Sequence, residues 1–224
     1  MLRRIRDRLL IRLAVLTERL RDPIEAELLP RFANSPTNVH ISLPRTIVNP
    51  DRISMGDDVW VGPYSLLMAQ DSYPGPPLRN PNHPEPLQTF DSKLTIGNRV
   101  TATSALQISV HREVTIEDDV LFAANVFISD GTHGYENANV PYKWQPIAHM
   151  APITIKRACW IGQNVLIMPG VTIGELSIIG ANSVVTRSVP ARSIAVGAPA
   201  RVVKSWDEDR QEWIPVPGNR PGDL

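Results

Sequence analysis

The stretch from Ile155 to Val185 decides the fold, and it reads IKRACW IGQNVL IMPGVT IGELSI IGANSV V. An aliphatic residue begins each group of six, at Ile155, Ile161, Ile167, Ile173, Ile179 and Val185. A helix is excluded, because at 3.6 residues per turn position i+6 lies well off the face of residue i. A period of six fits short strands joined by tight turns, with each inward side chain packed on its equivalents one coil away. The period therefore predicts a parallel β-solenoid.

The same spacing occurs earlier in the chain, with breaks. Its members are Ile41, Ile47 and Ile53, then Met55, Val61 and Leu67, then Ile96, Ala102 and Ile108, then Ile116, Phe122 and Ile128. Three hexads make one coil, so we expect about six coils over residues 41–200. Residues 70–92, which are rich in proline, and residues 130–152 interrupt the period. They predict loops inserted at corners, where binding and catalytic sites tend to be built.

The two ends differ from the repeat. Residues 1–40 predict an amphipathic helix and a linker, since Leu2, Ile5, Leu9, Leu13, Leu16 and Leu20 follow a spacing of three and four. Seven arginines face two acidic residues between Met1 and Arg21. This helix could pack on the solenoid or on a neighbouring subunit, or it could lie on an anionic membrane surface. For residues 201–224 we expect a short capping helix over Arg201 to Trp213, followed by a loose tail.

The charge balance and the cysteine content exclude several classes of protein. Lys+Arg and Asp+Glu are equal at 23 each, so no overall field would attract nucleic acid. The one cysteine, Cys159, excludes an internal disulfide framework and fits a reducing, cytoplasmic compartment. Arginines interrupt the apolar residues of the N-terminus, so neither a secretory segment nor a membrane span is expected there.

The repeat resembles that of the left-handed β-helix acyltransferases, in particular the sugar O-acetyltransferases of the galactoside and maltose acetyltransferase type. The motif of an aliphatic residue followed by a small one, with a small or aliphatic residue at the fifth position, stands at Ile161–Leu166, Ile167–Thr172 and Ile96–Thr101. The resemblance implies an all-β, left-handed parallel β-helix that forms a homotrimer. It also implies acetyl-CoA as co-substrate and no metal.

His133 is the candidate general base. Of the five histidines it alone starts an interruption, five residues after Ile128, and its neutral imidazole can accept a proton at cytoplasmic pH. Its surroundings resemble those of the catalytic histidine in the family. Asp130 could orient the imidazole, bind a substrate hydroxyl or cap a turn. By the same resemblance Thr103 and His111 line the acceptor pocket, although an acidic residue is common at the position of His111.

The donor site is implied by the stretch from Pro152 to Val203, which resembles the CoA-binding coils of the family. The residues implied to bind CoA are Trp160, Gly162, Gly180, Ala181, Thr186, Arg187 and Arg201. The small residues would let the pantetheine arm run along backbone, and guanidinium groups suit phosphates. Arg187 stands where the family usually has lysine. Cys159 is a poor nucleophile candidate, because a lone cysteine inside a coil usually packs.

The sequence thus predicts an acetyl-CoA-dependent O-acetyltransferase acting on a sugar hydroxyl, in a surface polysaccharide or a glycan precursor. N-acylation of an amino sugar uses the same base and thioester and stays open. A zinc-dependent carbonic anhydrase of the γ class, on the same fold, needs a second histidine close to His133, but Ala138 stands five residues after it. A non-catalytic β-helix scaffold is the remaining alternative.

Overall fold

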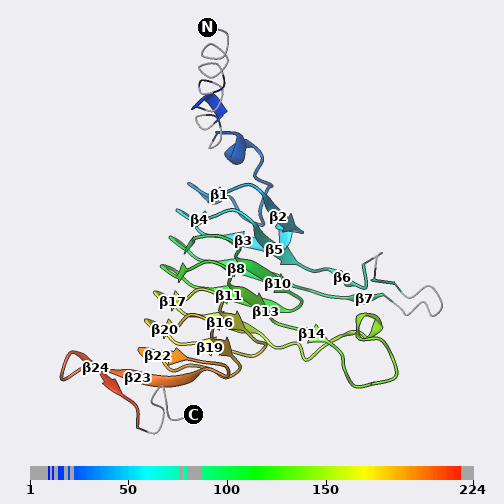
Figure 1. Cartoon of the computed structure of the whole chain (residues 1–224). Coiled ribbons are helices and arrows are strands. Elements are labelled where there is room, and N and C mark those ends of the chain that lie inside the picture. The colour runs from blue at the N-terminus through cyan, green and yellow to red at the C-terminus, as the bar shows by residue number, and fades with distance from the viewer. Residues whose placement is uncertain are drawn as a thin grey trace.

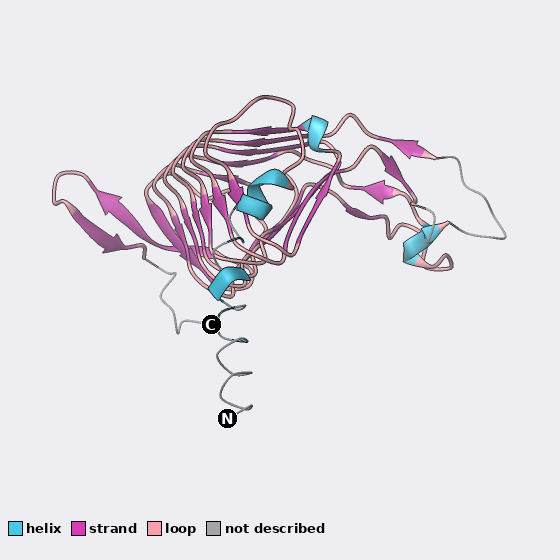
Figure 2. Cartoon of the chain, turned by 90° about the horizontal axis from the view of Figure 1, so that it is seen from above, coloured by secondary structure: helices cyan, strands magenta, loops and turns pink. Residues whose placement is uncertain are grey.

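The computed structural model describes residues 10, 12, 15–17, 20, 23–75, 78–79 and 87–217 of the chain. Short strands stack as successive rungs along one axis (Figure 1). Viewed from above, the rungs outline a prism with three faces (Figure 2). Within each face, neighbouring strands of the prism run parallel. The predicted parallel β-helix is confirmed.

The chain visits the three faces in a fixed order, and we number the faces and the corners between them accordingly. Face 1 contains β1 (His40–Ile41), β4 (Trp60–Val61), β9 (Thr101–Ala102), β12 (Leu121–Phe122), β17 (Trp160–Ile161), β20 (Ile178–Ile179) and β22 (Ser193–Val196). Face 2 contains β2 (Arg45–Val48), β5 (Ser65–Ala69), β10 (Gln107–Val110), β13 (Phe127–Ser129), β18 (Leu166–Ile167) and β21 (Val184–Val185). Face 3 contains β3 (Ile53–Met55), β8 (Lys93–Ile96), β11 (Glu113–Ile116), β16 (Ile153–Ile155) and β19 (Thr172–Ile173). The six strands of face 2 match the expected number of coils.

The residues of the six-residue period form columns inside the prism. On face 2 the register aligns Leu67, Ile108, Ile128, Ile167 and Val185, all with 0% exposure. Burial of one such side chain stabilises the fold by about 1.5–3 kcal/mol. Ile47 heads this column and is only partly buried, because its strand β2 is the outermost strand of face 2. The six-residue period therefore identified the core correctly, and Ile47 at the open end of the column is less buried than the others.

The corners turn at residues in the left-handed backbone region. Asn125, Asn164 and Asn182 occupy corner 1–2 in successive coils, with φ between 58° and 59°. Asparagine tolerates this region better than most residues. The side chains also pair along the axis, since Asn164 Nδ2 donates to Asn182 Oδ1 at 2.9 Å. Turn chemistry thus repeats with the same period as the core.

Both interruptions leave the prism at corner 2–3 and project on the same side (Figure 2). The corner's first turn is η1 (Pro50–Arg52). The first excursion, residues 70–92, pairs β6 (Ser72–Tyr73) with β7 (Gln88–Thr89), and the second, residues 130–152, pairs β14 (Thr132–His133) with β15 (Ile147–Ala148) and carries η3 (Tyr142–Trp144).

Direct contacts join the two excursions to each other. The Gln88 amide donates to the backbone carbonyl of Ile147 and accepts from its N–H, both at 2.9 Å. Tyr73, Phe90 and Ile147 form a small buried cluster of their own, separate from the core of the prism. The described parts of the two excursions are therefore joined to each other beside the solenoid.

The C-terminal capping helix is a wrong prediction. Residues Arg201–Asp207 and Glu212–Pro215 form β23 and β24, an antiparallel hairpin that extends face 1 from β22. The free edge of β22 offers unpaired backbone groups that a strand can satisfy and a helix cannot. β-branched and aromatic residues also favour a strand. Trp206 and Trp213 do pack, edge to face across the hairpin at 5.5 Å.

Most of the predicted N-terminal helix lies outside the described residues, so it stays a prediction. Of its apolar stripe Leu16 and Leu20 are described, and both are exposed, at 51% and 45%. Residues 23–27 are helical and bring Glu25 against the first coil. Among the helices that can be traced in the described ranges, none is both long and apolar enough to cross a membrane.

Candidate active site

His133 is the second residue of β14, and its imidazole is exposed. It lies opposite Ile147 of β15. The Nδ1 atom is 3.2 Å from the hydroxyl oxygen of Tyr73, and the two rings meet edge to face with centroids 5.4 Å apart. The predicted base therefore stands on the second excursion and has a side-chain partner from the first.

Tyr73 is absent from the predicted site residues, because nothing in the proline-rich segment marks it. The side chain is 4% exposed and packs with Phe90 and Ile147. Its hydroxyl donates a hydrogen bond to the backbone carbonyl of Lys143. Burial raises the pKa of Tyr73, so the phenol keeps its proton at neutral pH.

Asp130 occupies a different place from the one expected of a substrate ligand. Its side chain has 0% exposure, and its oxygens accept the backbone N–H groups of His111, Arg112 and Glu113, each at 2.7 Å. Oδ1 also lies 3.2 Å from Nδ1 of His111. This is the turn-capping alternative, and a carboxylate with no exposed surface has nothing to offer a substrate hydroxyl. In the described chain no hydrogen bond or ion pair joins Asp130 to His133.

The two predicted acceptor residues lie at different corners. His111 is at corner 2–3, 5% exposed, with its ring edge to face with Phe90 at 5.3 Å. A Cβ atom on Gly131 would come within 3.0 Å of its Nδ1 atom, so glycine makes room for the buried ring. Thr103 is exposed at corner 1–2, where its hydroxyl donates to the carbonyl of Phe122 at 3.3 Å. One chain therefore does not bring Thr103 to His133.

The seven predicted donor-binding residues form two groups. Trp160, Gly162, Gly180 and Ala181 lie on face 1 or at corner 1–2, and Arg201 joins them because it pairs with Val196 at the end of β22. Thr186 and Arg187 follow β21 at corner 2–3. Gly162 is required by coil stacking in any case, since a Cβ atom there would lie 2.7 Å from the backbone nitrogen of Ala181. The exposed guanidinium groups of Arg187 and Arg201 suit phosphate oxygens. The chemical types of the seven residues suit CoA, but the residues are divided between two corners of one chain.

Metal and thiol chemistry have little support in the described part of the chain. No three His, Cys, Asp or Glu side chains within the described ranges are grouped to hold a metal ion. Cys159 is 1% exposed, and its Sγ atom donates to the carbonyl of Gly174 at 3.0 Å. Burial raises the pKa of the Cys159 thiol to about 11. The sulfur therefore stays protonated and is a poor nucleophile, as expected.

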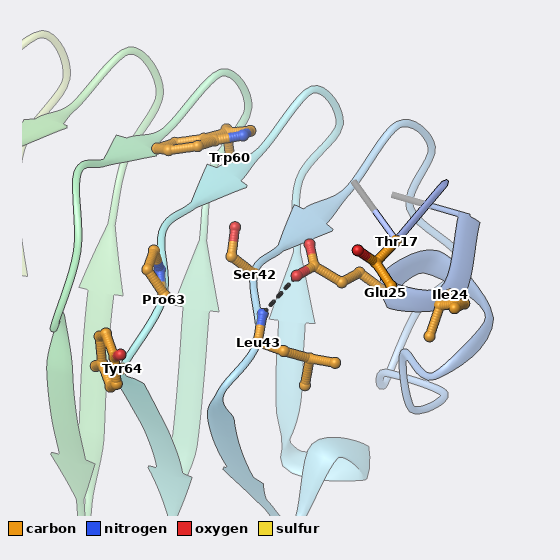
Figure 3. A pocket seen from close by; sticks show the side chains of 8 residues that line it. All are labelled: Thr17, Ile24, Glu25, Ser42, Leu43, Trp60, Pro63 and Tyr64. Carbon is orange, nitrogen blue, oxygen red and sulfur yellow. Dashed lines mark hydrogen bonds between the residues drawn. The ribbon is translucent and has the colours of Figure 1, made fainter. Parts of the chain in front are cut away.

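A pocket of about 640 Å³ opens beside the first coils and has a mostly apolar rim, formed by Ile24, Leu43, Trp60, Pro63 and Tyr64. Figure 3 shows the Glu25 carboxylate reaching the backbone N–H of Leu43, a hydrogen bond of 2.9 Å.

Near this pocket a serine, a histidine and a carboxylate also meet. Ser42 Oγ and Glu25 Oε2 lie 3.0 Å and 3.2 Å from the same ring nitrogen, Nε2 of His40. In a catalytic Ser-His-acid triad the serine and the carboxylate contact opposite nitrogens of the imidazole ring. The buried carboxylate therefore ties the N-terminal segment to the prism and does not activate a nucleophile.

Comparison with known proteins places the chain in a family. The model of the bacterial transferase hexapeptide (six repeats) matches residues 152–187. The protein SAV2555 of Staphylococcus aureus (strain Mu50), named as an acetyltransferase, is 40% identical over 152 residues, which cover 57% of this chain and 76% of the relative. The chain belongs to the hexapeptide-repeat acetyltransferase family.

Two further relatives come from Escherichia coli K12. Galactoside O-acetyltransferase is 39% identical over 116 residues, or 52% of this chain and 56% of the relative. WbbJ, named for lipopolysaccharide biosynthesis O-acetyl transfer, is 32% identical over 123 residues, or 52% of this chain and 62% of the relative. The chain thus spans less than two thirds of the length of either relative.

Among solved structures, AntD, an N-acyltransferase from Bacillus cereus in complex with dTDP and 3-hydroxybutyryl-CoA, superposes with a TM-score of 0.53. The match covers 80% of this chain and 86% of AntD at 21% identity. At that identity the likeness supports the fold.

Proposed function

We propose that this chain is an acetyl-CoA-dependent O-acetyltransferase that acts on a sugar hydroxyl, in a surface polysaccharide or a glycan precursor. The observation that carries the proposal is the exposed His133, held by Tyr73 on an ordered excursion from hexapeptide coils. The names of the two Escherichia coli relatives, one for a galactoside and one for lipopolysaccharide biosynthesis, support a sugar acceptor.

His133 performs the proton transfers in this reaction. Its Nε2 atom takes the proton of the acceptor hydroxyl as that oxygen attacks the thioester carbonyl. A C–O bond forms, the C–S bond breaks, and the imidazolium returns the proton to the departing thiolate. The base is thereby regenerated without an acyl-enzyme, which agrees with Cys159 being a buried thiol. Backbone N–H groups beside the bound thioester would stabilise the oxyanion.

The proposed active form is a homotrimer, and the outward residues of the prism support it. Face 1 exposes Trp60, Leu121 and Trp160 at 42%, 44% and 50%, and face 2 exposes Phe127 and Leu166 at 38% and 39%. Face 3 instead presents a polar column of Ser54, Thr95, Thr115, Thr154 and Thr172. Exposed apolar surface of this kind is typical of subunit contacts.

In a closed ring of three copies, corner 1–2 of one copy can meet corner 2–3 of the next. The site would then combine Trp160, Gly162 and Thr103 of one copy with His133 of another. We propose a cytoplasmic enzyme, with membrane contact through the N-terminal helix remaining a prediction.

A paired substitution tests this assignment. Activity is measured as turnover of acetyl-CoA with a panel of sugars, amino sugars and glycan precursors. In the His133→Ala variant we expect this turnover to fall by about 10²-fold or more, the scale of a general base. The affinity of the variant for CoA should be unchanged. In the Arg201→Ala variant we expect the reverse, weaker CoA binding with little loss at saturation. Both are measured by thiol release and by calorimetry with CoA.

The matched control is His149→Ala, since His149 also lies on the second excursion but pairs with Glu136. Full activity of His133→Ala would remove the base from the proposal. Acetylation of amino sugars alone would favour N-acylation, and wild-type protein inactive on the whole panel would favour a scaffold. Stoichiometric zinc in the purified protein would favour the carbonic anhydrase alternative.

A further inference from the structure

The first excursion supplies the partner of the base. We infer that Tyr73 is a positioning residue that sets the ring tautomer of His133 and so leaves Nε2 free to accept a proton. The effect on turnover rests on the proposed function, whereas the tautomer can be measured without it.

The direction of the hydrogen bonds fixes where the protons lie. The oxygen of Tyr73 contacts two groups, the backbone carbonyl of Lys143 and Nδ1 of His133. A carbonyl oxygen can only accept, so the single hydroxyl proton goes to Lys143. The contact with His133 then needs a proton on Nδ1, donated to a lone pair of the tyrosine oxygen. A neutral imidazole carries one ring proton, so Nε2 has none.

The position of Tyr73 is itself well determined. Its side chain is 4% exposed and packs in the small cluster with Phe90 and Ile147. The Gln88 amide joins the next strand of the same excursion to the backbone of Ile147. Because these contacts come from both excursions, the hydroxyl cannot move away from His133 without disturbing them.

No other group competes for the role in the part of the chain that the structure describes. Nε2 of His133 has no hydrogen-bond partner there, and the residue is exposed. Asp130, for which orienting the imidazole was one of three possible roles, is occupied by His111 and three backbone N–H groups. Tyr73 therefore fills the orienting role that was one of the alternatives for Asp130.

The test is the Tyr73→Phe variant, which keeps the buried ring and removes the oxygen. We expect kcat to fall about tenfold or more, within the 10²–10⁴-fold that a general base contributes in total, with KM for acetyl-CoA unchanged. Ring ¹⁵N chemical shifts of the full-length protein should show the Nδ1–H tautomer of His133 in the wild type and its loss in the variant. The His133→Ala spectrum identifies the resonances.

The matched control is Tyr142→Phe, a tyrosine of the second excursion that is 56% exposed; it should alter neither kcat nor the spectrum. A wild-type His133 protonated on Nε2 would overturn the inference, whatever the activity and whether or not the variant folds. A Tyr73→Phe variant with wild-type tautomer and kcat would overturn it too. If His133→Ala stays active while the tautomer depends on Tyr73, the proposed function fails and the tautomer assignment stands.

Discussion

In the coils each inward residue packs on its own equivalent one turn away, whereas in the excursions residues far apart in sequence meet through contacts that occur only once in the molecule. Ile167 pairs with Ile128 above and Val185 below, and all three are fully buried. Tyr73 and His133 are 60 residues apart, and the hydroxyl oxygen of Tyr73 lies 3.2 Å from Nδ1 of His133. A repeated contact is supported by every neighbouring rung, but a single contact is supported only by its own surroundings. The difference suggests that the coils supply stability and the excursions supply chemistry.

The sharpest way to test this division is within one coil strand. On β19 the side chain of Ile173 points inward with 0% exposure, and its neighbour Thr172 points outward and is exposed. Ile173→Ala should destabilise the protein by about 2–5 kcal/mol, because it leaves a cavity between rungs. Thr172→Ala should cost under about 1 kcal/mol. Urea unfolding followed by circular dichroism measures both, and equal shifts in midpoint would contradict the packing of the columns.

A smaller effect is expected at the junction between coil and excursion. Asp130→Asn puts an amide donor where the carboxylate accepts three N–H groups of residues 111–113. Leaving buried donors unsatisfied should destabilise the protein by about 1–3 kcal/mol. The control is Asp91→Asn, whose carboxylate is fully exposed and 3.6 Å from Arg52. A variant at Asp130 as stable as the control would show that the corner does not depend on the charge.

The smallest effect should come from the bridge between the excursions. Gln88→Ala removes two hydrogen bonds to the backbone of Ile147 and should cost about 0.5–1.5 kcal/mol locally. We expect faster amide exchange at Thr89 and Ile147 and unchanged exchange in the coils. Gln107→Ala on β10, where the side chain is exposed, is the control. Faster exchange throughout the prism would mean that the excursions support the coils.

Some of the site could be read from the sequence and some could not. His133 is proposed as the base because it stands where the strict period is interrupted, and Cys159 is set aside because it lies inside that period. Tyr73 could not be found, since a tyrosine among prolines has no local pattern that links it to a histidine 60 residues later. Asp130 was assigned three possible roles, and only its burial separates them. The prediction of a C-terminal helix was wrong because the free edge of β22 is covered by a strand that pairs with it.

The sequence alone determined the parallel β-helix, the inward columns, the places where the chain leaves them and the family that the repeat resembles. It could do so because each coil contacts only its neighbours, so the same short pattern must recur at a constant spacing. The tertiary structure alone decided which side chain contacts the proposed base His133, which backbone groups Asp130 caps and how the last strand edge is covered. These contacts join segments separated by no regular interval, and they depend on where the folded chain places each group.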